Sequence, residues 1–206
     1  MSVSTVRRRT RLSPEERRAQ LLNCALSAFA EHGIARATHS HVASRAGVSI
    51  PAVYSYFRTR DDLVAATLAE VEVFLDRLIM ASLMRDELSA IDALMTLARL
   101  FADSVEEQPD RIRVWLDWST GTGSEHWAAY LKVLARLHSA TEAVIRRGQK
   151  ANDIPGWIDP VAAARIYIGG GHTLALMTFE GAPANEVDAA LRQIVGGASG
   201  WALKPE

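Results

Sequence analysis

The chain has 206 residues, of which 49% are apolar and 23% are charged. This composition fits a folded protein with a substantial core. The net charge of −1 conceals an asymmetry, because residues 1–60 hold ten arginines and three glutamates, whereas the remainder holds 13 basic and 21 acidic residues. The basic end suits a polyanion unless it is only a solvated charge run, and the acidic remainder is excluded as a nucleic-acid ligand on its own.

The single cysteine, Cys24, excludes an intramolecular disulfide framework and an all-cysteine metal site. No stretch approaches the roughly 18 consecutive apolar residues of a membrane span. The arginines near the N-terminus are followed by Ser13-Pro14-Glu15-Glu16 and not by the apolar region of a signal peptide. We therefore expect a cytoplasmic protein with no membrane partner.

The first elements in chain order are a flexible basic arm over residues 1–12 and a helix that starts after Ser13. Ser13 and Glu16 form the pattern of a capping box, Pro14 suits the first helical position, and Gly33 is a suitable stop. Two short helices follow, expected at about 39–46 and 50–57, with Thr38 and Ser49 as their N-caps.

The remaining pattern predicts six further helices, at about 61–84, 87–107, 110–119, 124–149, 159–179 and 185–201. The expected fold class is all-α. Its expected parts are the arm (1–12), a three-helix DNA-binding domain with a helix-turn-helix (13–60), and a larger helical domain for ligand binding and dimerisation (61–206).

The two short helices predict a helix-turn-helix. Small apolar residues, Val42, Ala43 and Ala46, let the first helix pack closely on the second, and Gly47 gives the turn its backbone freedom. Val48 and Val53 are expected to face inward. Ile50, Ala52 and Ser55 then point away from the core, toward a major groove.

The segment THSHVASRAGVSIPAVYSYFRTRDDL, residues 38–63, closely resembles the DNA-binding signature of the TetR family. The resemblance implies that Tyr56 and Arg60 bind backbone phosphates, that the caps Thr38 and Ser49 lie close enough to do so, and that base reading falls to the outward face of the second short helix. The expected DNA contacts are Arg9, Arg11, Thr38, His39, Ser49, Ile50, Ala52, Ser55, Tyr56, Arg58 and Arg60.

A narrower resemblance is to quorum-sensing master regulators of the LuxR/HapR type. It rests on residues 11–15, on Gly33-Ile34 and His39, on the segment RTRDDLV, and on VWLDWS followed by Trp127. It implies that Arg9 and Arg11 of the arm enter a narrow minor groove. The chain departs from that subgroup at Ser55, where an asparagine is expected, and at the run Gly169-Gly170-Gly171.

An aromatic stripe on the helix expected at 124–149 predicts an apolar cavity between helices, in which a small apolar ligand would bind. The same stripe is more readily explained as ordinary core. The candidate lining residues are Phe74, Leu78, Phe101, Trp115, Trp127, Tyr130, Leu131, Leu134, His138 and Gly171.

The last two helices are apolar enough to need partners on both sides. By resemblance they form a four-helix interface with a second copy, and such a homodimer would bind a near-palindromic operator. No catalytic residue, metal site or cofactor is expected, because His39 and His41 project from different faces of one helix and lack acidic or cysteine partners.

The leading hypothesis is therefore a dimeric, sequence-specific transcriptional regulator, modulated by a small ligand and acting in quorum sensing. Two alternatives stay open: a ligand-independent dimeric regulator with a filled C-terminal core, and a small-molecule-binding protein whose DNA binding is vestigial. The sequence leaves the operator, the ligand and the choice between repression and activation undetermined.

Overall fold

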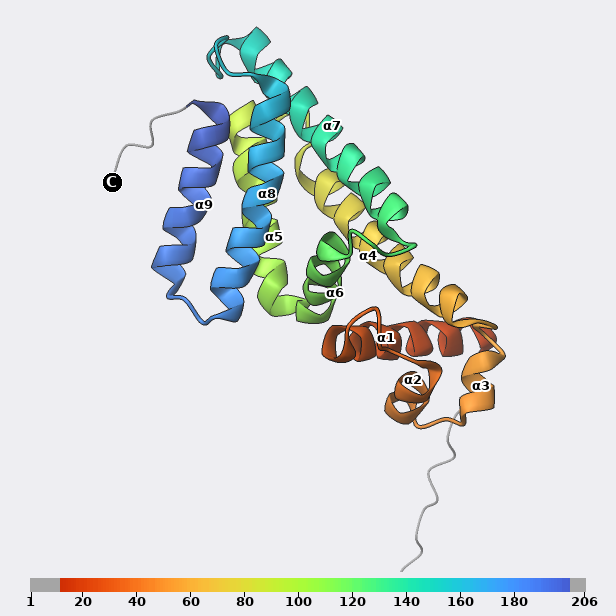
Figure 1. The fold of residues 1–206 in the computed structure, drawn as a ribbon. Coiled ribbons are helices and arrows are strands. Elements are labelled where there is room, and N and C mark those ends of the chain that lie inside the picture. The colour runs from red at the N-terminus through yellow and green to blue at the C-terminus, as the bar shows by residue number, and fades with distance from the viewer. Residues whose placement is uncertain (1–11, 201–206) are drawn as a thin grey trace, which may run out of the picture. The chain divides into compact units, whose positions relative to one another are not determined.

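A computed structural model describes residues 12–200 of the chain, and within that range all regular structure is helical (Figure 1). This confirms the all-α prediction. Contact clustering divides the chain after Thr67, inside α4, into two compact units that are described separately below. The helices are α1 (Pro14–His32), α2 (His39–Ala46), α3 (Ile50–Tyr54), α4 (Arg60–Ser82), α5 (Ala90–Glu107), α6 (Pro109–Thr120), α7 (Trp127–Ala151), α8 (Pro160–Phe179) and α9 (Ala184–Ser199).

The predicted helices differ from these at the starts of α5 and α7 and at the end of α3, which stops at Tyr54, three residues before the expected end at Phe57. Helix α5 begins three residues later than expected because Ser89 is its N-cap: the hydroxyl of Ser89 accepts a hydrogen bond from the backbone N–H of Asp92 at 3.1 Å. Helix α7 also begins late, since the residues before Trp127 form a turn in which the Trp127 N–H donates to the carbonyl of Ser124.

The N-terminal unit contains α1, α2, α3 and the first residues of α4. The predicted capping box starts α1, with the Ser13 N–H donating to the Glu16 carboxylate at 2.7 Å and the Glu16 N–H donating to the Ser13 hydroxyl at 3.1 Å. Helix α2 packs against both α1 and α3. Phe29, Val42 and Val53, one from each helix, are fully buried between them.

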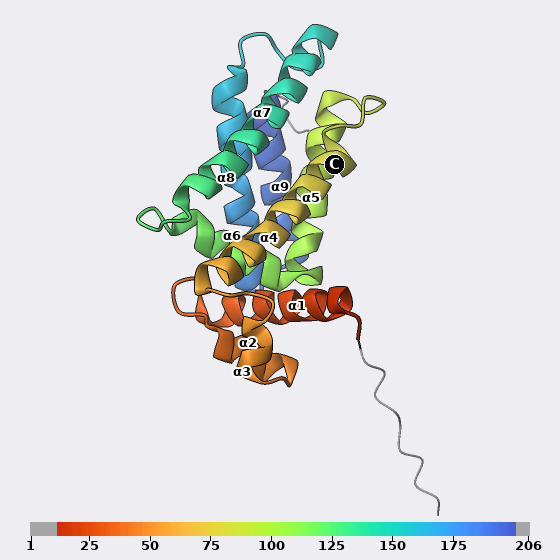
Figure 2. The same ribbon diagram turned by 90° about the vertical axis from the view of Figure 1, so that its right-hand side faces the viewer.

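In the C-terminal unit, α8 lies between α7 and α9, and α5 packs against all three (Figures 1 and 2). The hydroxyl of Tyr167 on α8 donates to the carbonyl of Leu94 on α5 at 2.6 Å. Burial raises the pKa of Tyr167 far above its ordinary value, so this hydroxyl remains a donor at every accessible pH. Among residues 12–200, no helix combines the length and the apolar character that a bilayer crossing requires.

His39 is part of the N-terminal core, which corrects its expected role as a DNA contact. Only 4% of the residue is exposed. Its Nε2–H donates to the carbonyl oxygen of Phe57 at 2.8 Å, and its ring stacks on Tyr54 with centroids 4.0 Å apart. The side chain therefore joins α2 to the segment after α3, and we leave it out of the proposed DNA contacts.

Replacing His39 with Phe is expected to lower the free energy of unfolding by about 1–3 kcal/mol, because the buried carbonyl of Phe57 then loses its hydrogen bond. Phenylalanine keeps a ring against Tyr54, so the loss reports the hydrogen bond. Urea unfolding measures it, with the exposed Ser40→Ala as a control that changes stability by less than about 0.5 kcal/mol. Equal stability of wild type and His39→Phe would show that the carbonyl has another partner.

Candidate DNA interface and ligand cavity

The turn between α2 and α3 depends on one left-handed residue. Gly47 has φ of 63° and ψ of 39°, a region that residues with a Cβ rarely adopt. Its N–H bonds back to the carbonyls of α2, as does the Val48 N–H, which donates to Ala43 at 3.1 Å. The chain then reverses within three residues, so that Ser49 caps α3 immediately.

Helix α3 presents a mainly apolar face to solvent. Ile50 is 43% exposed and Tyr54 is 48% exposed, whereas Val53 is fully buried. Ser55 is exposed too, but its hydroxyl donates to the carbonyl of Ala52 at 2.7 Å. The outward face that the sequence predicted is thus present, and the hydroxyl that it offers already has a partner within the turn.

Arg60 is held inside the N-terminal unit more firmly than its expected role as a phosphate contact requires. Its Nε–H donates to the carbonyl of Ala37 at 3.3 Å, and its Nη2 donates to the carbonyl of Ile34. These bonds fasten the first turn of α4 to the loop after α1. The guanidinium stays partly exposed, so its remaining N–H groups are free to meet a phosphate.

A surface hollow lies beside the half-buried Tyr56, between the start of α1 and α3. Its lining includes Arg17, Val48, Ala52 and Tyr56, so a cation and a phenol border one concave surface. Arg17 was not among the predicted contacts. Its position one turn into α1 was the only sequence signal for it.

Three of the other predicted contacts lie on the surface of the described part of the chain, and two lie outside it. Thr38, Ser49 and Arg58 are exposed. Arg45, which was not among the predicted contacts, forms an ion pair with Glu31. Arg9 and Arg11 lie outside the described residues, so their role in the arm stays a prediction.

In the C-terminal unit, an apolar space of about 50 Å³, the inner cavity, is lined by residues of all the helices from α4 to α9. Its lining includes Leu75, Leu78, Phe101, Trp115, Tyr167 and Gly171. A space of this volume holds only a few water-sized groups. Leu78, Phe101, Trp115 and Gly171 are thus brought together as predicted, whereas Leu75 and Tyr167 were missed.

The remaining predicted pocket residues line a second space, the outer groove, which lies between α7 and α8, is open to solvent and has a volume of about 510 Å³. The predicted residues on it are Tyr130, Leu131, Leu134 and His138; Arg165, Ile168 and His172 join them from α8. Phe74 and Trp127 line neither space. The single predicted pocket therefore corresponds to two, because the stripe on α7 faces α8 rather than the interior.

A thin partition separates the two spaces. Ile168 lines both, and the rings of Trp115 and His172 are 4.2 Å apart. The hydroxyl of Ser119 donates to the carbonyl of Leu116, so the Nε2–H of His172 donates to that hydroxyl oxygen at 2.9 Å. The Nε1–H of Trp115 is buried and has no hydrogen-bond partner among the described residues.

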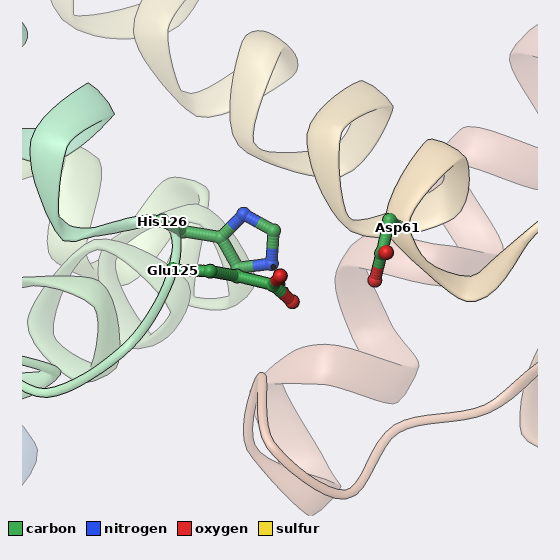
Figure 3. A group of neighbouring side chains, drawn as sticks. All are labelled: Asp61, Glu125 and His126. Carbon is green, nitrogen blue, oxygen red and sulfur yellow. Dashed lines mark ion pairs between the residues drawn. The ribbon is translucent and has the colours of Figure 1, made fainter.

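Acidic and imidazole groups meet just before α7, where Glu125 and His126 are adjacent (Figure 3). Glu125 Oε1 lies 3.6 Å from His126 Nε2. Asp61, which Figure 3 also labels, belongs to the N-terminal unit. Among the described residues of the C-terminal unit, only two potential metal ligands therefore come together here, Glu125 and His126. A protein metal site uses more than two.

Helices α8 and α9 share an exposed face of small and apolar residues. Ile166 is 67% exposed and Leu176 is 53% exposed. Further exposed positions of this face, spaced three or four residues apart, are Ala162, Gly169 and Thr173 on α8 and Ala189, Gln193 and Gly197 on α9. Large apolar side chains in water beside small ones favour close approach of another helical surface.

Burial lowers the pKa of His172 below its ordinary value of 6.5. The unfolded chain therefore binds this proton more readily, and the contribution of His172 to stability, complete above pH 6.5, is lost as the pH falls toward the folded value. We expect His172→Gln to make the fall in unfolding free energy between pH 7.5 and 5.5 shallower, as measured by urea titrations. An unchanged slope would contradict this.

A family profile and individual relatives both match this chain in sequence. The profile described as "Bacterial regulatory proteins, tetR family" matches residues 21–67, which span the helix-turn-helix. The regulator TtgR of Pseudomonas putida is 36% identical over 166 residues, which are 76% of this chain and 77% of TtgR. The regulator LuxR of Vibrio harveyi is 34% identical over 125 residues, 61% of this chain and 60% of LuxR's own length.

Solved structures share the fold. A TetR-like regulator from Rhodococcus sp. RHA1 superposes with a TM-score of 0.76 at 21% identity, covering 91% of this chain and 96% of that one. FadR of Bacillus subtilis, solved in complex with stearoyl-CoA, superposes with a TM-score of 0.71 at 15% identity, covering 90% and 99%. The helix-turn-helix, the helical C-terminal unit and the likeness to TtgR together place this chain in the TetR family of DNA-binding transcriptional regulators.

Proposed function

We propose that the chain works as a homodimer whose two α3 helices read the half-sites of a near-palindromic operator. The observation that carries this proposal is α3 itself, which follows a left-handed turn at Gly47 and turns Ile50 and Tyr54 outward. A helix held in this way fits the major groove, and a two-fold dimer matches a two-fold site.

The proposed phosphate contacts surround α3. They are Thr38, Ser49, Tyr56, Arg58 and Arg60 from the sequence prediction, with Arg17 added because it borders the hollow beside Tyr56. Arg9 and Arg11 would reach an adjacent minor groove. These groups fix the position of the protein on the duplex without reading bases.

Reading by α3 is proposed to depend on apolar contacts and on DNA shape. Ile50 and Ala52 have no hydrogen-bonding side-chain group, and the Ser55 hydroxyl is already donating. Contacts to thymine methyl groups and the deformability of the operator then carry the preference.

The exposed face of α8 and α9 is proposed to be the dimer interface. Ile166 and Leu176 point outward, and Gly169 on α8 and Gly197 on α9 are exposed beside them. Such a face is suited to packing on the same face of a second copy. A cytoplasmic regulator of this kind needs no further partner besides DNA.

The inner cavity supports modulation by a small apolar ligand. Its lining includes Leu75 and Leu78 of α4, the same helix whose first turn holds the loop after α1 through Arg60. A ligand that binds one tilt of α4 more tightly than another would change DNA affinity by that difference. The likeness to LuxR supports membership of the quorum-sensing subgroup as the biological setting.

The volume of the inner cavity favours a second candidate function, a dimeric regulator that needs no ligand. A space of about 50 Å³ is far below the several hundred cubic ångströms of an ordinary ligand pocket. On this alternative the aromatic side chains fill a core and the abundance of the protein sets its activity.

Selection of bound sequences from a random duplex library is expected to recover a two-fold symmetric motif. On that motif, Tyr56→Phe should weaken binding by about three- to tenfold for all sequences alike, since one hydrogen bond to phosphate is lost. Ile50→Ala should mainly alter sequence preference, because it removes the apolar contact proposed for reading, and Arg58→Ala should reduce the slope of affinity against salt by about one. The matched control is Lys150→Ala on α7. Unaltered affinity in all three variants would contradict the assigned interface.

Replacing Ile166 with Asp is expected to weaken dimerisation by at least about tenfold, because each symmetric interface would bury two uncompensated carboxylates. Sedimentation equilibrium at micromolar concentration measures the dissociation constant. Val73→Asp is the matched control, since Val73 is a comparably exposed apolar residue on α4. A dimer that survives Ile166→Asp unchanged would place the interface elsewhere.

A further inference from the structure

The outer groove combines an apolar floor with a single permanent positive charge. Leu131, Leu134 and Ile168 supply the floor, and Arg165 lies at its edge. No aspartate or glutamate is among the residues that line the groove. Arg165 forms no ion pair within the described part of the chain. A cation with no acid beside it, next to apolar surface, is suited to a ligand that carries an anion at one end.

The two histidines of the groove, His138 and His172, leave Arg165 as the one charged side chain among the residues that line it. Burial, and secondly the charge of Arg165, lower the pKa of His138. Burial also lowers the pKa of His172. Both imidazoles are therefore neutral at pH 7, when Arg165 alone carries charge and the imidazoles serve as polar neighbours.

The groove also lies directly against the inner cavity. Ile168 lines both spaces, and the His172 ring touches Trp115, which lines the cavity. His172 is held in place by its hydrogen bond to Ser119. One layer of side chains thus separates the charged space from the apolar one.

The groove borders the proposed dimer interface on α8, because Gly169 belongs to both surfaces. Arg165, Ile168 and His172 are spaced three and four residues apart and therefore share one helical face, the face toward α7. Ile166 and Thr173 lie further around α8 from the groove.

We propose that the outer groove and the inner cavity form one site for a single-chain amphiphile with an acidic headgroup, in which Arg165 binds the headgroup, the alkyl chain lies along the groove and only its far end passes His172 into the cavity. This inference rests on the proposed function in one respect, that the inner cavity receives a ligand. It adds the chemical class of that ligand and the residue that selects it. Carboxylate and phosphate headgroups share the required chemistry.

The cavity end of the site offers one polar group of its own. The Nε1–H of Trp115 is buried without a partner. A buried donor of this kind costs free energy until an acceptor reaches it. An oxygen atom on the alkyl chain would meet that need, so a hydroxy- or oxo-substituted chain is expected to bind more tightly than a plain one of equal length.

Isothermal titration calorimetry on the full chain tests the proposal, with decanoate and 1-decanol as a matched pair of probes below their aggregation limits. Decanoate is expected to bind at least about tenfold more tightly than decanol, the usual size of a charge-assisted hydrogen-bonded pair. Arg165→Gln should remove that advantage and leave decanol binding unchanged. Arg77→Gln, an exposed arginine of α4 that lines neither space, is the control and should change neither affinity.

Gly171→Leu separates the two halves of the site. A Cβ at Gly171 would lie 3.5 Å from Phe101 and 3.7 Å from Trp115, so a larger side chain fills the inner cavity. Binding of both probes is then expected to fall. Cooperative thermal unfolding of each variant, and its retained affinity for the selected operator, verify that the variant is folded.

The outcomes distinguish this inference from the function on which it rests. Equal binding of decanoate and decanol, unaffected by Arg165→Gln, overturns the acidic headgroup but leaves a ligand-modulated regulator standing. No binding of either probe, while the operator is still bound, overturns both the amphiphile and ligand modulation and leaves the ligand-independent regulator. Separately, tighter binding of 10-hydroxydecanoate, whose hydroxyl is at the far end of the chain from the headgroup, than of decanoate supports the role of Trp115, and equal binding overturns that role.

Discussion

Arg60 begins α4 and at the same time donates hydrogen bonds to the carbonyls of Ile34 and Ala37 in the loop after α1. A guanidinium that donates hydrogen bonds to two backbone carbonyls is held in one orientation. The first turn of α4 and that loop therefore move together. The segment after α3 joins the same body through the bond between Phe57 and His39. Helix α3 is thus fastened to the start of α4, and α4 continues without a break past Thr67 into the C-terminal unit.

Local signals in the sequence predicted most of the fold. Capping side chains with a mechanism of their own, such as the pair Ser13 and Glu16, placed helix starts correctly, since each satisfies amides that a helix leaves unpaired. The start of α5 was wrong because Ser89 was not considered as a cap. The burial of His39 was out of reach, as its partner Phe57 lies 18 residues away and local periodicity carries no information about it.

The ligand site was the least predictable part. Periodicity identified an aromatic stripe on α7, but the direction in which a stripe faces depends on how α7 packs against α8, and sequence spacing does not encode that. The residues that give the outer groove its charge and its partition, Arg165 and His172, lie on α8, from which only Gly171 was predicted to line a pocket. Small shifts between α7 and α8 would change the volume of both spaces, which makes this part of the unit the natural place for adaptation to different ligands.

The hydroxyl of Ser55, bound to the carbonyl of Ala52, has a consequence for how such a regulator diverges. A bidentate hydrogen-bonded base contact is worth about 1–3 kcal/mol, whereas one buried methyl group contributes about 0.8 kcal/mol. An α3 that reads through methyl contacts therefore loses little at each mismatched base pair. The sequence of an operator can then change one base pair at a time without loss of regulation. One protein can thus bind a set of related sites with graded affinities. Those small differences in affinity would set the order in which genes respond as the concentration of the protein rises.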